Sequence, residues 1–262
     1  MKKNIMKMSP AEYFYSMYRK CLSIVIYIKE YTAYKKEYYT FRRLSGAGDR
    51  FLLEWKNRYP CLYDKTSTTG FDRHYLYHSA WAARKVLHNR PNFHVDISSS
   101  LHFCSMVSAF IPVKFYDYRP VDLHLSGLTC DAADLLNLQF SDRSIQSLSC
   151  MHVVEHVGLG RYGDPLDPDG DLKAISELER VLALGGNLLF VVPIGQPKIM
   201  FNAHRIYSYE QIVSYFSGLE LKEFSLIPDD PKVEGLIQNA TKEMADAQTY
   251  GCGCFWFAHK TQ

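Results

Sequence analysis

The stretch DLKAISELERVLALGGNLLFVVP, residues 171–193, decides the fold, because it passes from a helical pattern to a strand pattern within a few residues. Apolar residues recur at helical spacing over 171–183, which predicts a helix there. Gly185-Gly186 is expected to close this helix as a C-cap turn. Residues 187–192 form a continuous apolar run, typical of a central strand that is buried on both faces.

The same alternation of helix and strand extends on both sides of this stretch. Further strands are predicted at 93–97, 113–117, 127–130, 145–150, 219–227 and 254–259, and further helices at 75–88, 101–108, 209–216 and 233–247. Alternation of this kind implies right-handed crossover units. We therefore expect an α/β fold with a Rossmann-like, doubly wound, mostly parallel seven-stranded sheet that ends in a C-terminal antiparallel strand.

An N-terminal helical arm is expected to precede this domain. No Gly or Pro interrupts residues 11–44, and Ser9-Pro10 is a suitable helix start, so a helix is predicted over 9–43 and a second helical piece over 51–58. Eight tyrosines are expected to give the arm an amphipathic surface. The domains are thus a basic, Tyr-rich extension over 1–65 and a main domain over 66–262.

Charge is distributed unevenly between these parts. Residues 1–44 hold ten Lys/Arg and three acids, although the whole chain carries a formal net charge of only +2. A basic arm indicates contact with an anionic surface or an acidic neighbour. Three readings stay open: packing on its own domain, packing on a partner protomer, and binding to phosphate-rich lipid or glycan precursor.

Composition favours a globular, cytoplasmic protein. The seven cysteines are scattered and suggest no disulfide framework, which favours a reducing compartment. The apolar run at 21–28 is too short for a membrane span and lacks the cleavage site of a signal peptide. Peripheral contact of the arm with the inner membrane face stays open. Cys252 and Cys254 alone are closely spaced, and no metal site is expected.

The predicted strands end in polar residues at the edge where parallel sheets bind ligands. The candidates are Asp96, Ser98, Ser99, Ser100, Asp117, Asp131 and Ala132. Asp117 is expected to accept hydrogen bonds from ribose hydroxyls and Asp131 to accept from the exocyclic amine of adenine. We therefore expect the carboxylates of Asp96, Asp117 and Asp131 to converge on one adenosine-shaped pocket.

These residues resemble the motifs of class I S-adenosylmethionine (SAM) dependent methyltransferases. The resemblance lies in residues 95–100, 131–142, 152–156 and 179–193. More closely, His74-Tyr75, Trp81, residues 158–170 and residues 201–205 resemble a bacterial and nematode methyltransferase-like family of unknown function, whose bacterial members are often associated with surface polysaccharide synthesis. The resemblance implies SAM as cofactor, held by the seven candidates named above.

One departure from the superfamily concerns the first motif, which carries glycines where this chain has serines at 98–100. A serine pays for the left-handed backbone conformation that glycine adopts freely. Either the turn avoids positive φ, or SAM binding is weakened or lost.

Methyl transfer to a hydroxyl needs alignment and a base, and a histidine suits the second task. The catalytic candidates are His152, Glu155, His156 and His204, with Glu155 orienting an imidazole. Arg161, Tyr162, Asp164 and Arg205 are candidates for binding the acceptor. A polar, Gly/Pro-punctuated loop of this kind suits sugar hydroxyls, so we expect O-methylation of a sugar or glycan-precursor hydroxyl and no nucleic-acid partner.

Other functions are weaker matches. The segment 152–156 also fits H-x-x-E-H, the inverted zinc-peptidase signature, but Gly158 and Gly160 leave too little continuous helix for that site. No G-x-G-x-x-G follows the first strand, which disfavours a NAD(P) oxidoreductase. The main alternative is a catalytically inactive, methyltransferase-like binding or scaffold module. The sequence leaves the oligomeric state open.

Overall fold

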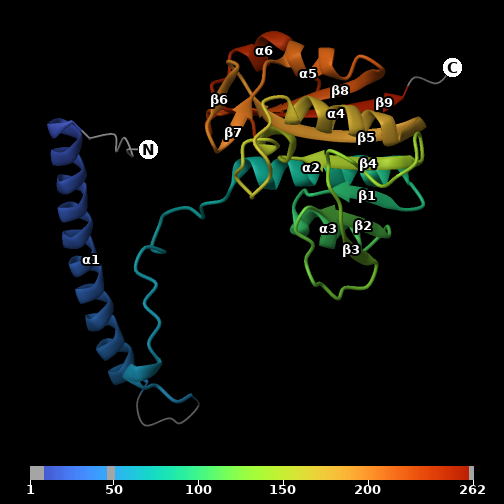
Figure 1. Ribbon diagram of the computed structural model, residues 1–262. Helices are drawn as coiled ribbons and strands as arrows, with labels where there is room; N and C mark the ends of the chain where they lie inside the picture. The colour runs from blue at the N-terminus through green and yellow to red at the C-terminus, as the bar shows by residue number, and fades with distance from the viewer. Residues whose placement is uncertain (1–8, 46–50, 260–262) are drawn as a thin grey trace. The chain divides into compact units, whose positions relative to one another are not determined.

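The computed structural model describes residues 9–45 and 51–259 and divides into two compact units, residues 1–70 and 71–262 (Figure 1). The first unit contains the expected long helix, α1 (Pro10–Leu44). Its start is fixed by a capping box, in which Ser9 Oγ accepts from the Glu12 N–H at 3.2 Å and the Glu12 carboxylate accepts from the Ser9 N–H at 2.7 Å. The boundary between the units falls a few residues beyond the predicted one.

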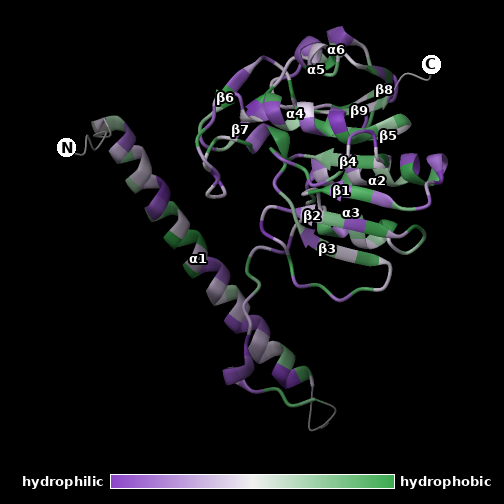
Figure 2. Ribbon diagram, turned by 45° about the vertical axis from the view of Figure 1, so that its right-hand side comes forward, coloured by the Kyte–Doolittle hydropathy of each residue, from purple (hydrophilic) through white to green (hydrophobic). Residues whose placement is uncertain are grey.

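Hydrophobic and hydrophilic residues are mixed along the whole of α1 (Figure 2). Five exposed apolar residues, Leu22, Ile24, Val25, Ile26 and Ile28, lie at nearly consecutive positions. Successive helical residues are rotated by about 100°, so these side chains point in all directions. The expected amphipathic surface is therefore wrong. Among the residues described, no helix combines the length and the apolar character that a membrane span requires.

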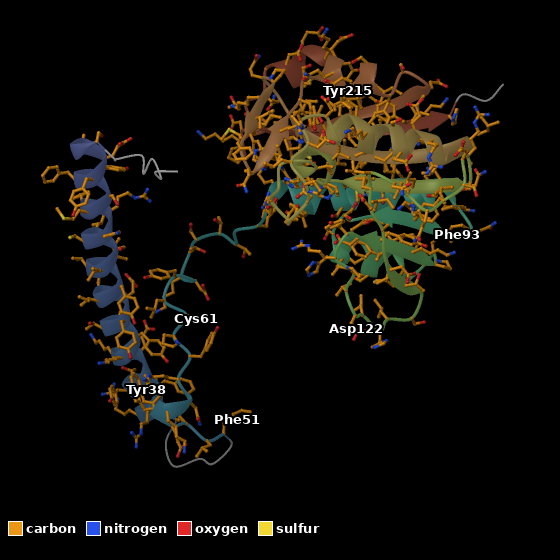
Figure 3. The ribbon with its side chains drawn as sticks, viewed as in Figure 1. Tyr38, Phe51, Cys61, Phe93, Asp122 and Tyr215 are labelled. Carbon is orange, nitrogen blue, oxygen red and sulfur yellow. The ribbon has the colours of Figure 1, made fainter. Side chains whose placement is uncertain are left out.

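The second helical piece predicted for the arm is also wrong, because 51–58 contains only one 3₁₀ turn, η1 (Trp55–Asn57). Pro60 disfavours helical backbone at Tyr59, and so short a segment forms no helix by itself. Trp55 instead packs against tyrosines of α1, with its ring centroid 4.8 Å from that of Tyr38 and 6.1 Å from that of Tyr39. Figure 3 labels Tyr38 among the side chains of α1.

The second unit is a seven-stranded sheet in the order β3-β2-β1-β4-β5-β9-β8. The strands are β1 (His94–Ile97), β2 (Val113–Asp117), β3 (Leu128–Ala132), β4 (Ile145–Met151), β5 (Leu182–Ile194), β8 (Leu219–Ile227) and β9 (Gly251–His259). The strands from β3 to β5 pair in parallel, whereas β9 is antiparallel to both β5 and β8. The predicted fold class is thereby confirmed.

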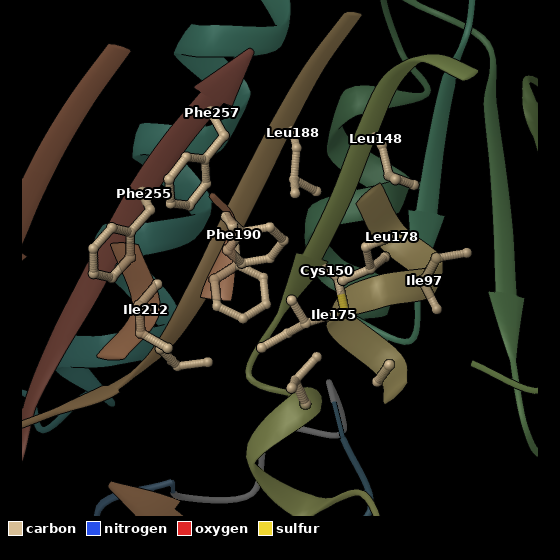
Figure 4. Packing of buried hydrophobic residues seen from close by; sticks show 14 of the residues in the cluster. Ile97, Leu148, Cys150, Ile175, Leu178, Leu188, Phe190, Ile212, Phe255 and Phe257 are labelled. Atoms are coloured by element: carbon tan, nitrogen blue, oxygen red, sulfur yellow. The ribbon is translucent and has the colours of Figure 1, made fainter. Parts of the chain in front are cut away.

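Helices cover both faces of this sheet (Figure 1). On one face, α4 (Gly170–Val181), α5 (Tyr209–Tyr215) and α6 (Lys242–Asp246) contribute to a buried cluster with Phe190 and Phe255. Figure 4 shows part of this cluster, with Ile175 and Leu178 of α4 against the strands. On the other face, α2 (Arg73–Asn89) and α3 (Leu101–Val107) pack on Phe115, Met151 and Cys252. A short hairpin of β6 (Lys198–Met200) and β7 (His204–Ile206), which the sequence did not predict, lies outside the main sheet.

Two local predictions are wrong. Gly185-Gly186 lies inside β5 rather than in a helix cap, because β5 begins directly after α4 and the pairing with β4 shifts register between Ile145 and Ser147. Gly185 has a φ of 69°, the conformation that glycine supplies at a bulge.

The helix predicted at 233–247 is shorter in the structure and consists of α6 alone. The backbone of Ile237 pairs with that of Leu226, and the side chain of Thr241 caps a helix that starts later.

The strand order places a topological switch point at β1. The chain continues from β1 to β2 on one side, whereas β4 lies on the other. In open α/β sheets the crevice beyond the carboxyl ends of such strands is the usual ligand site. The residues that follow β1 and β4 therefore border the expected ligand site.

Candidate active site

The turn after β1 takes the conformation of a glycine turn although it is made of serines. Ser98 has a φ of 55°, and its N–H donates to the Tyr116 carbonyl at 2.7 Å. The alternative that the turn avoids positive φ is therefore wrong. Ser98 itself adopts the left-handed conformation, at a strain of about 1–2 kcal/mol, so the serine does not by itself remove the backbone shape that a glycine would give, and whether SAM binding is weakened or lost stays a question for the binding measurement. Ser99 Oγ accepts from the Met151 N–H at 2.9 Å, which ties this turn to the end of β4. Ser100 is the N-cap residue of α3, without a side-chain cap bond.

Asp96 belongs to the interior of the sheet rather than to a ligand pocket. It is fully buried, its Oδ1 accepts from the Ser99 N–H at 3.0 Å, and the Ser149 hydroxyl donates to its Oδ2. Burial raises the pKa of Asp96 to about 6. The prediction that Asp96 contacts a cofactor is corrected accordingly, since this carboxylate holds the turn to which Ser98 and Ser99 belong.

The carboxylates of Asp117 and Asp131 do not converge. In the register of β2 and β3, Asp117 pairs with Ala132 and Tyr116 pairs with Asp131. Because successive side chains of a strand alternate between faces, Asp131 lies on the opposite face of the sheet from Asp117. The expected pocket formed by three carboxylates is therefore wrong. Asp117 is half-buried at the end of β2, with its Oδ1 accepting from the Arg119 N–H at 2.7 Å.

A cavity does lie beyond the ends of β2 and β3. Its volume is about 290 Å³, and its lining includes Tyr118, which follows Asp117, and Ala132. Asn137 and Gln139 add amide groups to the wall. With Ala133 and Asp134, the lining combines one aromatic ring with small apolar and polar side chains, the mixture found in small-molecule sites.

The segment after β4 carries three of the four catalytic candidates. His152 has a φ of 56° and is buried, with Nδ1 2.8 Å from Glu155 Oε1 and Nε2 3.4 Å from Cys252 Sγ. Since both of its nitrogens are engaged, His152 is a poor base for an acceptor hydroxyl. Glu155 is also buried, which raises its pKa to about 7, and its Oε2 has no hydrogen-bond partner among the described residues.

His156 is the better placed histidine. Its Nδ1 lies 2.6 Å from the Ala203 carbonyl, and its Nε2 lies 3.8 Å from Glu155 Oε1. Burial lowers the pKa of His156, and with it the fraction of charged imidazole at neutral pH. His204, the fourth candidate, begins β7, and its ring centroid is 6.4 Å from that of His156.

Two predicted acceptor-binding residues instead hold the loop 158–170 together. Asp164 accepts from the backbone N–H groups of Gly158, Gly160 and Tyr162. Arg205 is buried and donates to the backbone carbonyls of Val157, Asp167 and Pro168. The polar atoms of Asp164 and Arg205 thus bind the protein's own backbone. The prediction that these two residues bind the acceptor is corrected to a structural role in the loop.

Arg161 and Tyr162, the other two candidates for binding the acceptor, lie next to His156. The Tyr162 ring centroid is 5.7 Å from that of His156, and Arg161 donates to the Ala203 carbonyl at 3.1 Å. Arg119, which sequence reasoning missed, lies over the Tyr162 ring at 4.6 Å. The segment after β2 thus reaches the loop that surrounds His156.

Sequence reasoning also gave no role to four residues on the far side of His152. The ring centroids of His74, Tyr75 and His78 lie 5.5, 5.4 and 5.2 Å from that of His152, and Cys252 completes the group. Burial lowers the pKa of His74 and of His152 to about 4, and that of His78 to about 3. His74 and His78 lie four residues apart on α2 and so share one side of the helix, which was the signal in the sequence that could have revealed this group.

One family model matches part of this chain. Residues 135–246 match the family described as "Caenorhabditis protein of unknown function, DUF268", and no curated protein matches the chain. Among solved structures, YcgJ of Bacillus subtilis is 14% identical with a TM-score of 0.49, over 71% of this chain and 99% of that one.

Two methyltransferases are similar to the same degree. A SAM-dependent methyltransferase of Thermotoga maritima is 15% identical with a TM-score of 0.45, over 72% of this chain and 94% of that one. The 1,6-didemethyltoxoflavin-N1-methyltransferase of Burkholderia thailandensis, solved with S-adenosylhomocysteine, is 9% identical with a TM-score of 0.48, over 71% and 79%. At such low identity the likeness concerns the fold alone, and function has to be inferred from this chain's own residues.

Proposed function

We propose that the second unit is a SAM-dependent methyltransferase that acts on a hydroxyl group of a sugar or glycan precursor. The observation that carries this proposal is the bond between Ser99 Oγ and the Met151 N–H, at 2.9 Å. It joins the turn after β1 to the end of β4, so the turn that would hold the cofactor and the segment with Glu155 and His156 adjoin at the switch point. Ligands of open α/β sheets bind at this place.

The residues present fit the cofactor in two respects. Ser98 keeps the left-handed conformation that lets a backbone approach a ligand closely, and the cavity beside Tyr118 and Ala132 suits an adenine ring. Asp117, at the end of β2, is the carboxylate that would bind ribose hydroxyls. The cofactor would supply an electrophilic methyl group. Every other requirement, including alignment of the acceptor and removal of its proton, falls to the protein.

His156 is the base in this proposal. Its Nδ1 lies 2.6 Å from the Ala203 carbonyl oxygen and 3.3 Å from Arg161 Nη1, which itself donates to that carbonyl at 3.1 Å; the shorter contact is to an acceptor and assigns the proton to Nδ1. Nε2 is then unprotonated and takes the proton of the acceptor hydroxyl. Glu155 Oε1, 3.8 Å from Nε2, stabilises the imidazolium that results. Of the four candidates for binding the acceptor, Arg161 and Tyr162, which lie beside His156, remain.

Isothermal titration calorimetry with SAM and with S-adenosylhomocysteine tests the proposal. Wild-type protein should bind both, and Asp117→Ala should weaken binding at least about tenfold, because the ribose hydroxyls lose their acceptor. Asp122→Ala is the matched control, since the side chains of Asp122 and His124 are 93% exposed and lie 3.3 Å from each other (Figure 3 labels Asp122). Absence of binding at millimolar SAM would refute the enzyme and leave the binding or scaffold module.

A further inference from the structure

A group of side chains beside His152 takes no part in the proposed transfer. His74 of α2, His152 after β4 and Cys252 near the start of β9 each present one ligand atom, and these atoms lie within 4.8 Å of one another. His152 and Cys252 are buried and His74 is half-buried. Two imidazoles and a thiol from three separate elements thus meet at the carboxyl edge of the sheet.

The spacing of these atoms is close to that of a tetrahedral metal site. Zinc lies about 2.0–2.1 Å from histidine nitrogen and about 2.3 Å from cysteine sulfur, which puts neighbouring ligand atoms about 3.3–3.7 Å apart. Cys252 Sγ and His152 Nε2 are already 3.4 Å apart. Only His74, in the first turn of α2, has to approach.

His152 also has the outer partner that metal-bound histidines need. Its Nδ1 lies 2.8 Å from Glu155 Oε1, so Nδ1–H donates to the carboxylate and the lone pair of Nε2 faces Cys252. Metal-ligating histidines almost always donate their second nitrogen to a carboxylate or carbonyl, which fixes the tautomer and the ring orientation.

Two buried groups next to the cluster have polar atoms without a side-chain partner among the described residues. Apart from the backbone of His74, no described residue offers a hydrogen-bond partner to the ring nitrogens of His78, which is fully buried with its ring centroid 5.2 Å from that of His152. Glu155 Oε2 is the second case. Buried polar atoms are nearly always bonded, and these two exceptions beside the cluster, among others elsewhere in the described residues, accord with a ligand that the protein itself does not provide.

We propose that His74, His152 and Cys252 bind a divalent transition-metal ion of the zinc class. Imidazole and thiolate are the donors that zinc prefers, and three protein ligands leave the fourth tetrahedral position for water or a substrate oxygen. The Cys252 thiol releases its proton to solvent as the metal binds. The ligands lie far apart in the sequence, which is why sequence reasoning expected no metal. The site does not depend on SAM binding.

Cobalt substitution tests the site without any enzymatic assay. Full-length, tag-free protein is stripped with a chelator and titrated with Co²⁺. We expect about one equivalent to bind, with the visible absorption of tetrahedral cobalt and a near-ultraviolet thiolate-to-cobalt charge-transfer band, both displaced by Zn²⁺. Absence of a charge-transfer band at saturating cobalt would overturn the proposal.

Matched variants assign the ligands. Cys252→Ser should abolish the charge-transfer band, whereas Cys150→Ser, at a buried cysteine on the opposite face of the sheet, should keep it. His74→Ala should weaken cobalt binding at least about 100-fold, whereas His88→Ala, at an exposed histidine of the same helix, should not. If Cys252→Ser does not fold, His74→Ala decides. Unchanged cobalt affinity in His74→Ala would overturn the assigned ligand set, whatever the result of SAM calorimetry.

Discussion

His156 Nδ1 lies 2.6 Å from the carbonyl oxygen of Ala203, closer than the 3.3 Å to the donor Arg161 Nη1, and this shorter contact favours the tautomer with the proton on Nδ1. Because the carbonyl can only accept, the neutral ring carries its proton on Nδ1 and keeps Nε2 unprotonated. Ala203 precedes β7, so the hairpin β6–β7 determines the protonation pattern of a residue that follows β4. The role of His156 in the proposed transfer depends on this hairpin.

His156→Gln should therefore slow methyl transfer and leave the affinity for SAM within about twofold of wild type. A general base contributes about 100-fold or more to a rate, and the substitution removes the base without touching the turn at Ser98. Transfer of a labelled methyl group from SAM to a panel of sugars and nucleotide sugars measures the rate, and calorimetry measures the affinity. His204→Gln is the control and should cost less than tenfold. Undiminished turnover in His156→Gln would show that the base is another residue.

Gly158 and Gly163 offer a matched pair in the loop beside His156. Both have positive φ, 80° and 88°, but a Cβ at Gly158 would lie 2.0 Å from the Asp167 carbonyl oxygen, whereas a Cβ at Gly163 would have no described atom within 4 Å beyond its chain neighbours. Gly163→Ala should lower the free energy of unfolding by about 1 kcal/mol, from backbone strain alone. Gly158→Ala adds a backbone clash and should lower it by about 3 kcal/mol. Urea unfolding measures both, and equal losses would contradict the loop geometry.

Substitution of Arg205 should destabilise the fold far more than substitution of Arg161, because Arg205 is buried and Arg161 is exposed beside His156. Arg205 binds three backbone carbonyls, and its Nε lies 3.5 Å from Asp171, which is 6% exposed. Arg205→Ala should therefore destabilise the fold by about 3–5 kcal/mol, because it leaves a buried carboxylate without its cation. Arg161→Ala should change stability by less than about 0.5 kcal/mol, since this residue is exposed. Thermal and urea unfolding check the contrast, which disappears if Arg205 is instead free to bind an acceptor.

The sequence predicted the sheet far better than the site. Apolar runs such as 187–192 and helical spacing over 171–183 report burial directly, and burial against both faces of a sheet suffices to define this architecture. The site depends on side-chain direction, which strand ends do not reveal. The register that pairs Asp117 with Ala132 puts Asp131 on the other face, and Asp96 is bound by Ser149 from a strand that is distant in sequence. His74 and Cys252 meet His152 only through the fold.

His94 and Asp96 give a test of the buried polar network by pH. Ser149 Oγ lies 2.8 Å from His94 Nε2 and also donates to Asp96, and Ser147 Oγ lies 2.7 Å from His94 Nδ1. Burial lowers the pKa of His94 to about 3 and raises that of Asp96 to about 6. The stability that neutral His94 contributes is fully present above about pH 6.5 and is lost as pH falls toward 3.

The stability that Asp96 contributes depends on pH with the opposite sign. Its protonated form contributes stability that is fully present below about pH 3.8 and is lost as pH rises through about 6. Between pH 4 and 6.5, His94→Gln should therefore gain stability with rising pH less steeply than wild type, and Asp96→Asn should gain it more steeply. Urea unfolding across this range measures both slopes, with His124→Gln, at an exposed histidine, as control. Slopes that match wild type in both variants would mean that neither group is buried as described, and the turn at Ser98 would then be joined to β4 by the Ser99–Met151 bond without the contact between Asp96 and Ser149.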